Sequence, residues 1–154
     1  MDKQQAWQRV AGICSGQEKC IFEIKQKLIT WDVDIDVVND IIDQLCTEKY
    51  IDEKRYATAF TNDKFRFNVW GKKKIAHAMA EKKIPADFIE QALDLIPHVE
   101  YIDCLKALLI KKKSLLKEAD VYKLKIKLIR FAVSRGFEAQ VAFDVLGEII
   151  EIND

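Results

Sequence analysis

Apolar positions in this chain of 154 residues repeat three times, and this repeat constrains the fold more than any single motif. The second set follows the first after 51 residues, and the third follows the second after 53. Within each set, the spacing is typical of two amphipathic helices joined by a tight turn. The three sets are Ile24, Leu28, Val33, Val37, Ile41, Ile42 and Leu45; Ile75, Met79, Ile84, Phe88, Ala92, Leu93 and Ile96; and Leu128, Ala132, Phe137, Val141, Val145, Leu146 and Ile149.

Each set is preceded by a further segment with room for a helix. These segments are residues 4–14, 56–67 and 101–116. The sequence therefore predicts an all-α fold of three tandem three-helix repeats, forming an elongated, curved molecule. The expected repeats, each with its own small core, are residues 1–50, 51–100 and 101–154.

One segment argues against this interpretation. Residues 123–129 read KLKIKLI, and strict alternation by itself is typical of a half-buried strand. A single strand would have no partner elsewhere in the chain, and the other two repeats have helices at this place. We therefore expect a helix over 121–134.

Polar residues that can cap helices mark several expected helix starts. They are the SGQE segment at 15–18, which has the pattern of a capping box, and Asp36, Asp52 and Asp120. Gly136 can supply the left-handed turn between the last two helices. The corresponding place in the second repeat is occupied by Lys83, which would have to adopt a conformation that glycine enters more freely.

The net charge of zero hides a strong clustering of charges. Six acidic residues and a single lysine lie between Trp31 and Ile51. Segment 64–83 holds seven basic residues against one glutamate, and segment 106–135 holds ten against two acidic residues. The basic clusters can attract a polyanion or an acidic protein surface, while the molecule as a whole stays neutral.

The basic clusters supply our candidate residues for binding a protein partner or DNA. In the helix expected over 121–134, three of them share one stripe, and an apolar flank predicts a second contact with another repeat or with a partner. A merely solvated helix face is the alternative explanation for the charges. The candidates are Lys64, Arg66, Lys73, Lys74, Lys111, Lys112, Lys123, Lys127 and Arg130.

A family resemblance follows from segment 49–93, which begins KYIDEKRYATAF and continues through VWGKKKIAHAM. This segment resembles the signature of the RecX family. The shared features are an aromatic and aliphatic pair, an aspartate, an arginine followed by an aromatic residue and alanine, and a later glycine with basic residues. Segments 14–28 and 125–146 are similar to the flanking repeats of that family. The matching positions, expected to build the middle repeat, are Tyr50, Ile51, Asp52, Arg55, Tyr56, Ala57, Gly71 and Ile75.

The resemblance implies a non-enzymatic regulator that binds along the groove of the RecA–DNA filament. Such a protein modulates recombinase activity, ATP hydrolysis and strand exchange, and inhibition is the direction we favour. RecA would be its partner, with single- or double-stranded DNA as a further contact, and we expect a monomer. Lys49 and Lys83 depart from the family, which commonly has a turn glycine at both places.

Other functional classes have little support in the sequence. The two histidines lie in no catalytic motif, and the aspartates of segment 32–40 lack the central glycine and closing glutamate of a calcium loop. We therefore expect no catalysis, metal or cofactor. The four scattered cysteines read as ordinary free thiols, and the absence of a long apolar run predicts no membrane span and a cytoplasmic protein. The alternative function is a helical module that binds DNA or RNA directly, without a recombinase.

Overall fold

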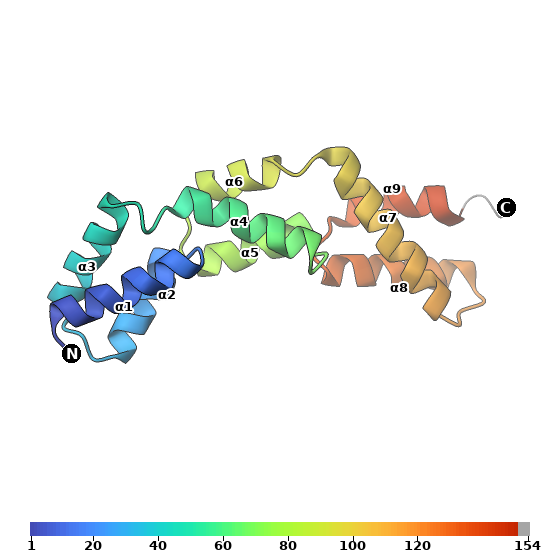
Figure 1. Cartoon of the computed structure of the whole chain (residues 1–154). Helices are drawn as coiled ribbons and strands as arrows, with labels where there is room; N and C mark the ends of the chain where they lie inside the picture. The colour runs from blue at the N-terminus through green and yellow to red at the C-terminus, as the bar shows by residue number, and fades with distance from the viewer. Residues whose placement is uncertain (151–154) are drawn as a thin grey trace. The chain divides into compact units, whose positions relative to one another are not determined.

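A computed structural model describes residues 1–150 of the chain, and Figure 1 shows that they form helices only. Segment 123–129 is helical, and the helix predicted over 121–134 is confirmed. The all-α prediction is confirmed over these residues. The helices are α1 (Lys3–Gly16), α2 (Ile21–Thr30), α3 (Ile35–Thr47), α4 (Glu53–Arg66), α5 (Lys72–Glu81), α6 (Ala86–Asp94), α7 (His98–Leu115), α8 (Val121–Ser134) and α9 (Ala139–Ile150).

Two of the predicted helix caps are confirmed. The carboxylate of Asp52 accepts a hydrogen bond of 3.0 Å from the backbone N–H of Arg55 at the start of α4. That of Asp120 accepts one of 3.0 Å from the backbone N–H of Lys123 at the start of α8. Each bond satisfies one of the amide groups that have no partner inside their own helix.

The other two predicted caps are wrong. Ser15 and Gly16 belong to the last turn of α1, and the capping box of α2 is formed instead by Cys20 and Glu23. Helix α3 already begins at Ile35, so Asp36 lies inside its first turn rather than before it. There its negative charge still favours the helix, because the N-terminus of a helix carries partial positive charge.

The turns after α3, α5 and α8 adopt the left-handed conformation. Gly136 has a φ of 95°, as expected for the residue between α8 and α9. Lys49 and Lys83, which stand where the family commonly has glycine, have φ of 66° and 62°. The expectation for Lys83 is therefore confirmed, and both lysines carry the steric cost that a Cβ atom meets in this region.

Packing divides the chain into two compact units. One comprises Met1–Phe60 and Met79–Ala92, and the other comprises Thr61–Ala78 and Leu93–Asp154. The division passes through α4, α5 and α6. The boundaries proposed for three repeats, at residues 50 and 100, stay a prediction.

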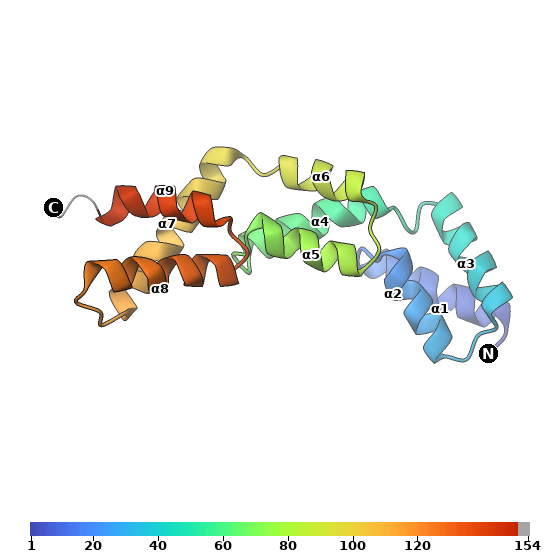
Figure 2. The same ribbon diagram turned by 180° about the vertical axis from the view of Figure 1, so that it is seen from behind.

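Every position of the apolar repeat is buried or half-buried. In the first unit, α3 packs against α1 and α2 over one hydrophobic cluster. In the second unit, α7 packs against both α8 and α9, which lie side by side in Figures 1 and 2. The largest fully buried side chains of the second unit are Ile75, Tyr101, Leu105, Leu109, Leu128, Phe137 and Leu146.

Replacement of Ile24 tests the assignment of the core face. The side chain is fully buried in the cluster of the first unit, so we expect Ile24→Ala to lower the free energy of unfolding by about 2–5 kcal/mol. Ile29 lies on the same helix but is 50% exposed, so Ile29→Ala should change it by less than about 0.5 kcal/mol. Urea unfolding followed by circular dichroism measures both variants. Equal losses would contradict the assignment.

Candidate partner and nucleic-acid interface

The backbones of Gly71 and Gly136 meet in the second unit. A Cβ atom on Gly71 would lie 2.3 Å from the carbonyl carbon of Gly136 and from the backbone nitrogen of Phe137. A Cβ atom on Gly136 would lie 2.3 Å from the Cβ of Lys74. Real Cβ atoms do not approach other heavy atoms so closely, so both positions need glycine. This contact, which we call the glycine junction, joins the start of α5 to the turn after α8.

Hydrogen bonds across the glycine junction satisfy the first amide groups of α5. The N–H of Gly71 donates to the carbonyl of Arg135 at 2.7 Å, and that of Lys73 donates to the carbonyl of Gly136 at 3.0 Å. These carbonyls follow the end of α8, where the helix dipole is negative. They therefore place negative potential beside an α5 terminus that carries three lysines.

Tyr101 of α7 is buried and contacts the start of α5 beside the glycine junction. Its ring lies between those of Phe65 and Phe137, with centroid distances of 5.9 and 5.1 Å. Its hydroxyl accepts a hydrogen bond of 3.0 Å from the N–H of Lys72 and donates to the carboxylate of Glu138. Burial and the bond to Glu138 raise the pKa of Tyr101 far above its ordinary value, so the hydroxyl stays protonated and acts as a fixed donor.

The three lysines at the start of α5 have different surroundings. Lys72 is half-buried, and its ammonium lies 5.0 Å from the centroid of the Tyr101 ring. Lys74 is half-buried with its ammonium 4.5 Å from the centroid of the Trp70 ring. Lys73 is exposed, as predicted for the lysine that points away from the core. Lys73 is thus the most exposed of the three to an incoming partner.

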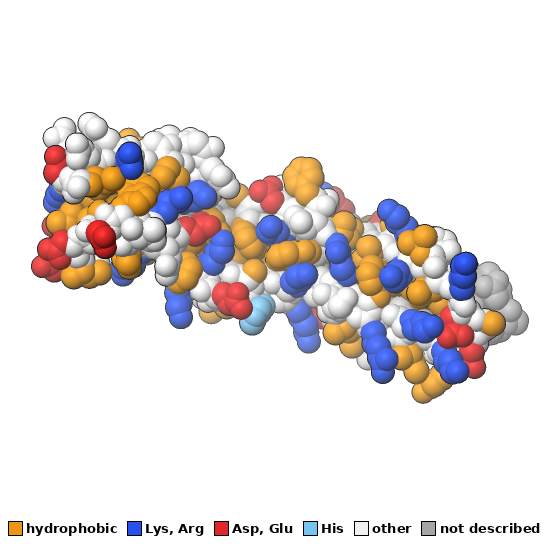
Figure 3. All heavy atoms as spheres, turned by 90° about the horizontal axis from the view of Figure 1, so that it is seen from below, with side chains coloured by type: hydrophobic (Ala, Val, Ile, Leu, Met, Phe, Trp, Pro, Cys, Tyr) orange, Lys and Arg blue, Asp and Glu red, His pale blue; other side chains and the backbone are white. Residues whose placement is uncertain are grey.

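On α8, the predicted basic stripe is exposed. Lys123, Lys127 and Arg130 all lie on the surface, and Figure 3 shows lysine and arginine side chains gathered over this helix. The ammonium of Lys127 pairs with Glu118 at 3.0 Å. In residues 1–150, the side chains of Lys123 and Arg130 form no ion pair or hydrogen bond, so their charges are available to a ligand.

The remaining basic candidates are partly engaged within the second unit. Arg66 pairs with Glu100 at 3.0 Å, and the ammonium of Lys112 lies 4.8 Å from the centroid of the Phe131 ring. Lys64 is half-buried, with its ammonium 4.9 Å from the centroid of the Trp70 ring. Lys111 on α7 is exposed.

The family-motif residues of the first unit are structural. Tyr56 and Ala57 are buried, and Tyr50 is half-buried with its ring edge-on to Trp7. The guanidinium of Arg55 pairs with Glu18 and donates to the carbonyls before α4, at Lys49 and Tyr50.

Two features of this surface were missed in the sequence interpretation. The pairing of Gly71 with Gly136 joins positions that no periodicity connects. Trp70, with two lysine ammonium groups near its ring, had a local signal, because aromatic and basic residues alternate in segment 64–74. That alternation is typical of proteins that bind single-stranded nucleic acid.

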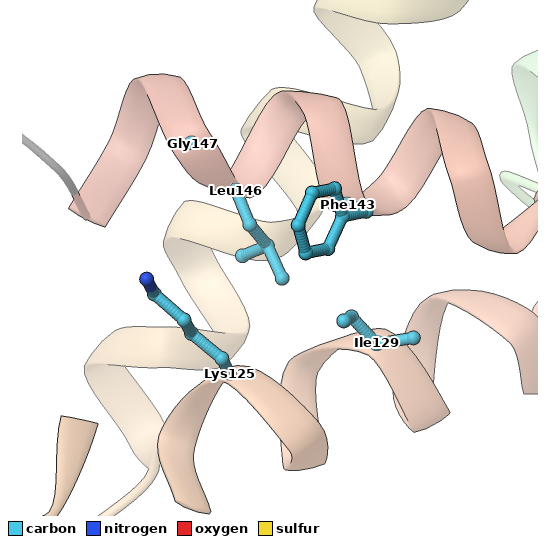
Figure 4. Close-up of a pocket in the computed structure, with 5 residues that line it drawn as sticks. All are labelled: Lys125, Ile129, Phe143, Leu146 and Gly147. Atoms are coloured by element: carbon cyan, nitrogen blue, oxygen red, sulfur yellow. The ribbon is translucent and has the colours of Figure 1, made fainter. Parts of the chain in front are cut away.

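The pocket between α8 and α9 and two buried thiols offer little catalytic chemistry. A pocket of about 160 Å³ between α8 and α9, shown in Figure 4, is lined by Lys125, Ile129, Phe143, Leu146 and Gly147, without an acid or a nucleophile. Burial raises the pKa of the Cys14 and Cys20 thiols to about 11, so they are poor nucleophiles at neutral pH. Residues 1–150 contain no metal-binding cluster of three histidine, cysteine or acidic side chains. None of their helices is long and apolar enough to cross a membrane.

These features define a class of protein: an all-helical fold over residues 1–150, with a row of exposed cations on α8. Two family models match the chain, one describing the second three-helix domain of RecX over residues 52–93 and one the third over residues 99–146. Together they cover more than half of the chain. The chain belongs to the RecX family.

Individual relatives agree with this assignment. The regulatory protein RecX of Clostridium botulinum (strain Eklund 17B / Type B) is 32% identical over 83% of this chain and 60% of its own length. That of Leuconostoc mesenteroides is 26% identical over 86% of this chain and 49% of its own length. The chain thus spans about half to three-fifths of these relatives. A crystal structure of RecX from Lactobacillus salivarius has the same fold, with a TM-score of 0.85, 20% identity and 95% of both chains covered.

Substitution of Gly71 tests the glycine junction. Because the new Cβ atom would meet rigid backbone at 2.3 Å, we expect Gly71→Ala to lower the free energy of unfolding by about 1–3 kcal/mol or more. Gly12 is the matched control, since a Cβ atom there meets nothing within 4 Å and alanine favours the interior of α1. Gly12→Ala should raise the value by about 0.5–1 kcal/mol. A Gly71→Ala protein with the parent's urea midpoint would contradict the tight approach.

Proposed function

We propose that this protein is a non-enzymatic regulator that binds the RecA–DNA filament and inhibits its recombinase, ATPase and strand-exchange activities. Its relatives carry the name regulatory protein RecX, which supports a regulatory role. RecA as the partner follows from the family resemblance of the chain. DNA within the filament is the second proposed contact.

The observation that carries this proposal is the exposed basic stripe of α8. Lys123, Lys127 and Arg130 share one face of a helix, with spacings of four and three residues. A filament presents DNA phosphates and protein carboxylates in a regular array, and an exposed row of cations can contact such an array at several points. Lys73 at the glycine junction adds a further exposed cation in the same unit.

Charge reversal on α8 tests the proposal. We expect Lys123→Glu combined with Arg130→Glu to weaken co-sedimentation with RecA filaments on DNA at least tenfold, because two attractions become repulsions. The fold should survive, since both side chains are exposed and a glutamate in the first turn of α8 suits the helix dipole. A parallel assay of RecA ATP hydrolysis should show less inhibition by the variant than by the parent.

A matched control reverses two exposed lysines of the first unit, Lys27 and Lys54, and so changes the net charge by the same amount. We expect Lys27→Glu with Lys54→Glu to bind filaments like the parent. If this control loses binding while the α8 variant keeps it, the stripe only solubilises the protein. If both bind like the parent, the interface lies elsewhere.

The second candidate function is a module that binds nucleic acid directly, and the same basic stripe favours it. Salt distinguishes the two functions. Binding to phosphates alone weakens steeply with added salt, by roughly 0.9 logarithmic units per contact for each tenfold increase, whereas a mixed contact with RecA weakens less. The second candidate is favoured if the protein binds bare DNA as tightly as it binds the filament and if this binding shows the full salt dependence.

A further inference from the structure

The end of α4, the start of α5 and the residues 67–71 that join them have an unusual composition. Residues 64–74 interleave three aromatic side chains with five cations and contain no acidic residue. At its centre, Phe67 is 80% exposed, the highest value for a large apolar side chain among the described residues. A ring so exposed buries little apolar area on folding and is accessible to a ligand.

Hydrogen bonds shape this segment into a closed loop. The N–H of Trp70 donates to the carbonyl of Lys64 at 3.0 Å, and that of Phe67 donates to the carbonyl of Asp63 at 2.9 Å. Phe67 thus continues the last turn of α4, and Trp70 folds back onto that turn. The ammonium groups of Lys64 and Lys74 lie 4.9 and 4.5 Å from the Trp70 ring centroid, so cation–π attraction orients both cations at the loop.

The loop also contains a costly backbone conformation. Val69 has a φ of 53°, which is rare for a β-branched residue. Arg135 holds this conformation, because its guanidinium donates to the carbonyls of Asn68 and Val69. Strain of this kind persists where the surrounding structure enforces it, and it gathers at sites that bind ligands.

We propose that residues 64–74, the loop between α4 and α5 with the flanking helix turns, form a stacking site for an unpaired nucleobase of single-stranded nucleic acid. The exposed ring of Phe67 offers its face to a base, and the ammonium groups of Lys64 and Lys74 attract the flanking phosphates. Base stacking on aromatic side chains beside a cationic path is the general mode of binding to single strands. A duplex hides the faces of its bases, so it does not fit this site.

This site goes beyond the proposed function, because stacking of a base requires no recombinase. It also differs from the basic stripe of α8, which offers cations but belongs to another segment of the chain. An acidic peptide would match the lysines but not the flat, exposed ring of Phe67. Contact with a protein is therefore an outcome of the test rather than the proposal.

The test compares two labelled oligonucleotides of equal length by fluorescence anisotropy: oligo-dT, and an abasic strand with the same phosphates but no bases. The full chain is used without RecA. We expect the parent to bind oligo-dT about tenfold more tightly than the abasic strand, a difference that one stacked base can supply. Phe67→Ala should lose this preference and bind both strands alike. Its melting curve should match the parent's, because the side chain is exposed.

Phe143→Ala is the matched control, since Phe143 lies in the same unit and is 61% exposed but belongs to α9. It should bind oligo-dT like the parent. The proposal is overturned if the parent does not distinguish the strands or binds neither, or if Phe67→Ala keeps the preference. It is also overturned if Phe67→Ala weakens binding only to RecA without DNA, which would make the loop a protein contact.

Filament binding of the α8 variant is measured separately, so the two ideas can fail independently. A parent protein that binds filaments but shows no preference for bases keeps the proposed function and loses the stacking site. A parent protein that prefers oligo-dT but does not bind filaments keeps the stacking site and loses the proposed function.

Discussion

The close approach of two glycines governs the second unit of this protein. Gly71 and Gly136 let the start of α5 and the turn after α8 touch through their backbones, at distances that no Cβ atom tolerates. The carbonyls at the end of α8 then satisfy the first N–H groups of α5. Since these carbonyls form the negative end of a helix dipole, the contact lowers the electrostatic cost of three consecutive lysines at a helix start.

The junction also organises the surface around it. Lys72 and Lys74 turn toward Tyr101 and Trp70, whereas Lys73 stays exposed. Arg135, one residue before Gly136, holds the loop that carries Phe67 in a strained form. The exposed stripe of α8 and the aromatic loop thus belong to one unit, and they present two different chemistries: a row of cations and a ring that can stack. The proposed binding to a nucleoprotein filament would use both.

Most of the helical framework could be predicted from the sequence. Every position of the apolar repeat is buried or half-buried, and comparison of the three copies predicted that KLKIKLI is a helix despite its alternation. Caps were harder to predict. Asp52 and Asp120 cap their helices, but the SGQE segment and Asp36 do not. Several polar residues near each helix start can act as the cap, and packing selects among them.

The candidate site was predictable as a set of residues but not as an arrangement. Charge clustering pointed to the basic residues, and helical spacing placed three of them on one exposed stripe. The sequence by itself determined the helices and their buried faces, because periodicity and turn chemistry act between near neighbours in the chain. Only the tertiary structure decided that Gly71 meets Gly136 and that Arg55 pairs with Glu18. Those choices depend on distances between residues far apart in sequence, which no local pattern encodes.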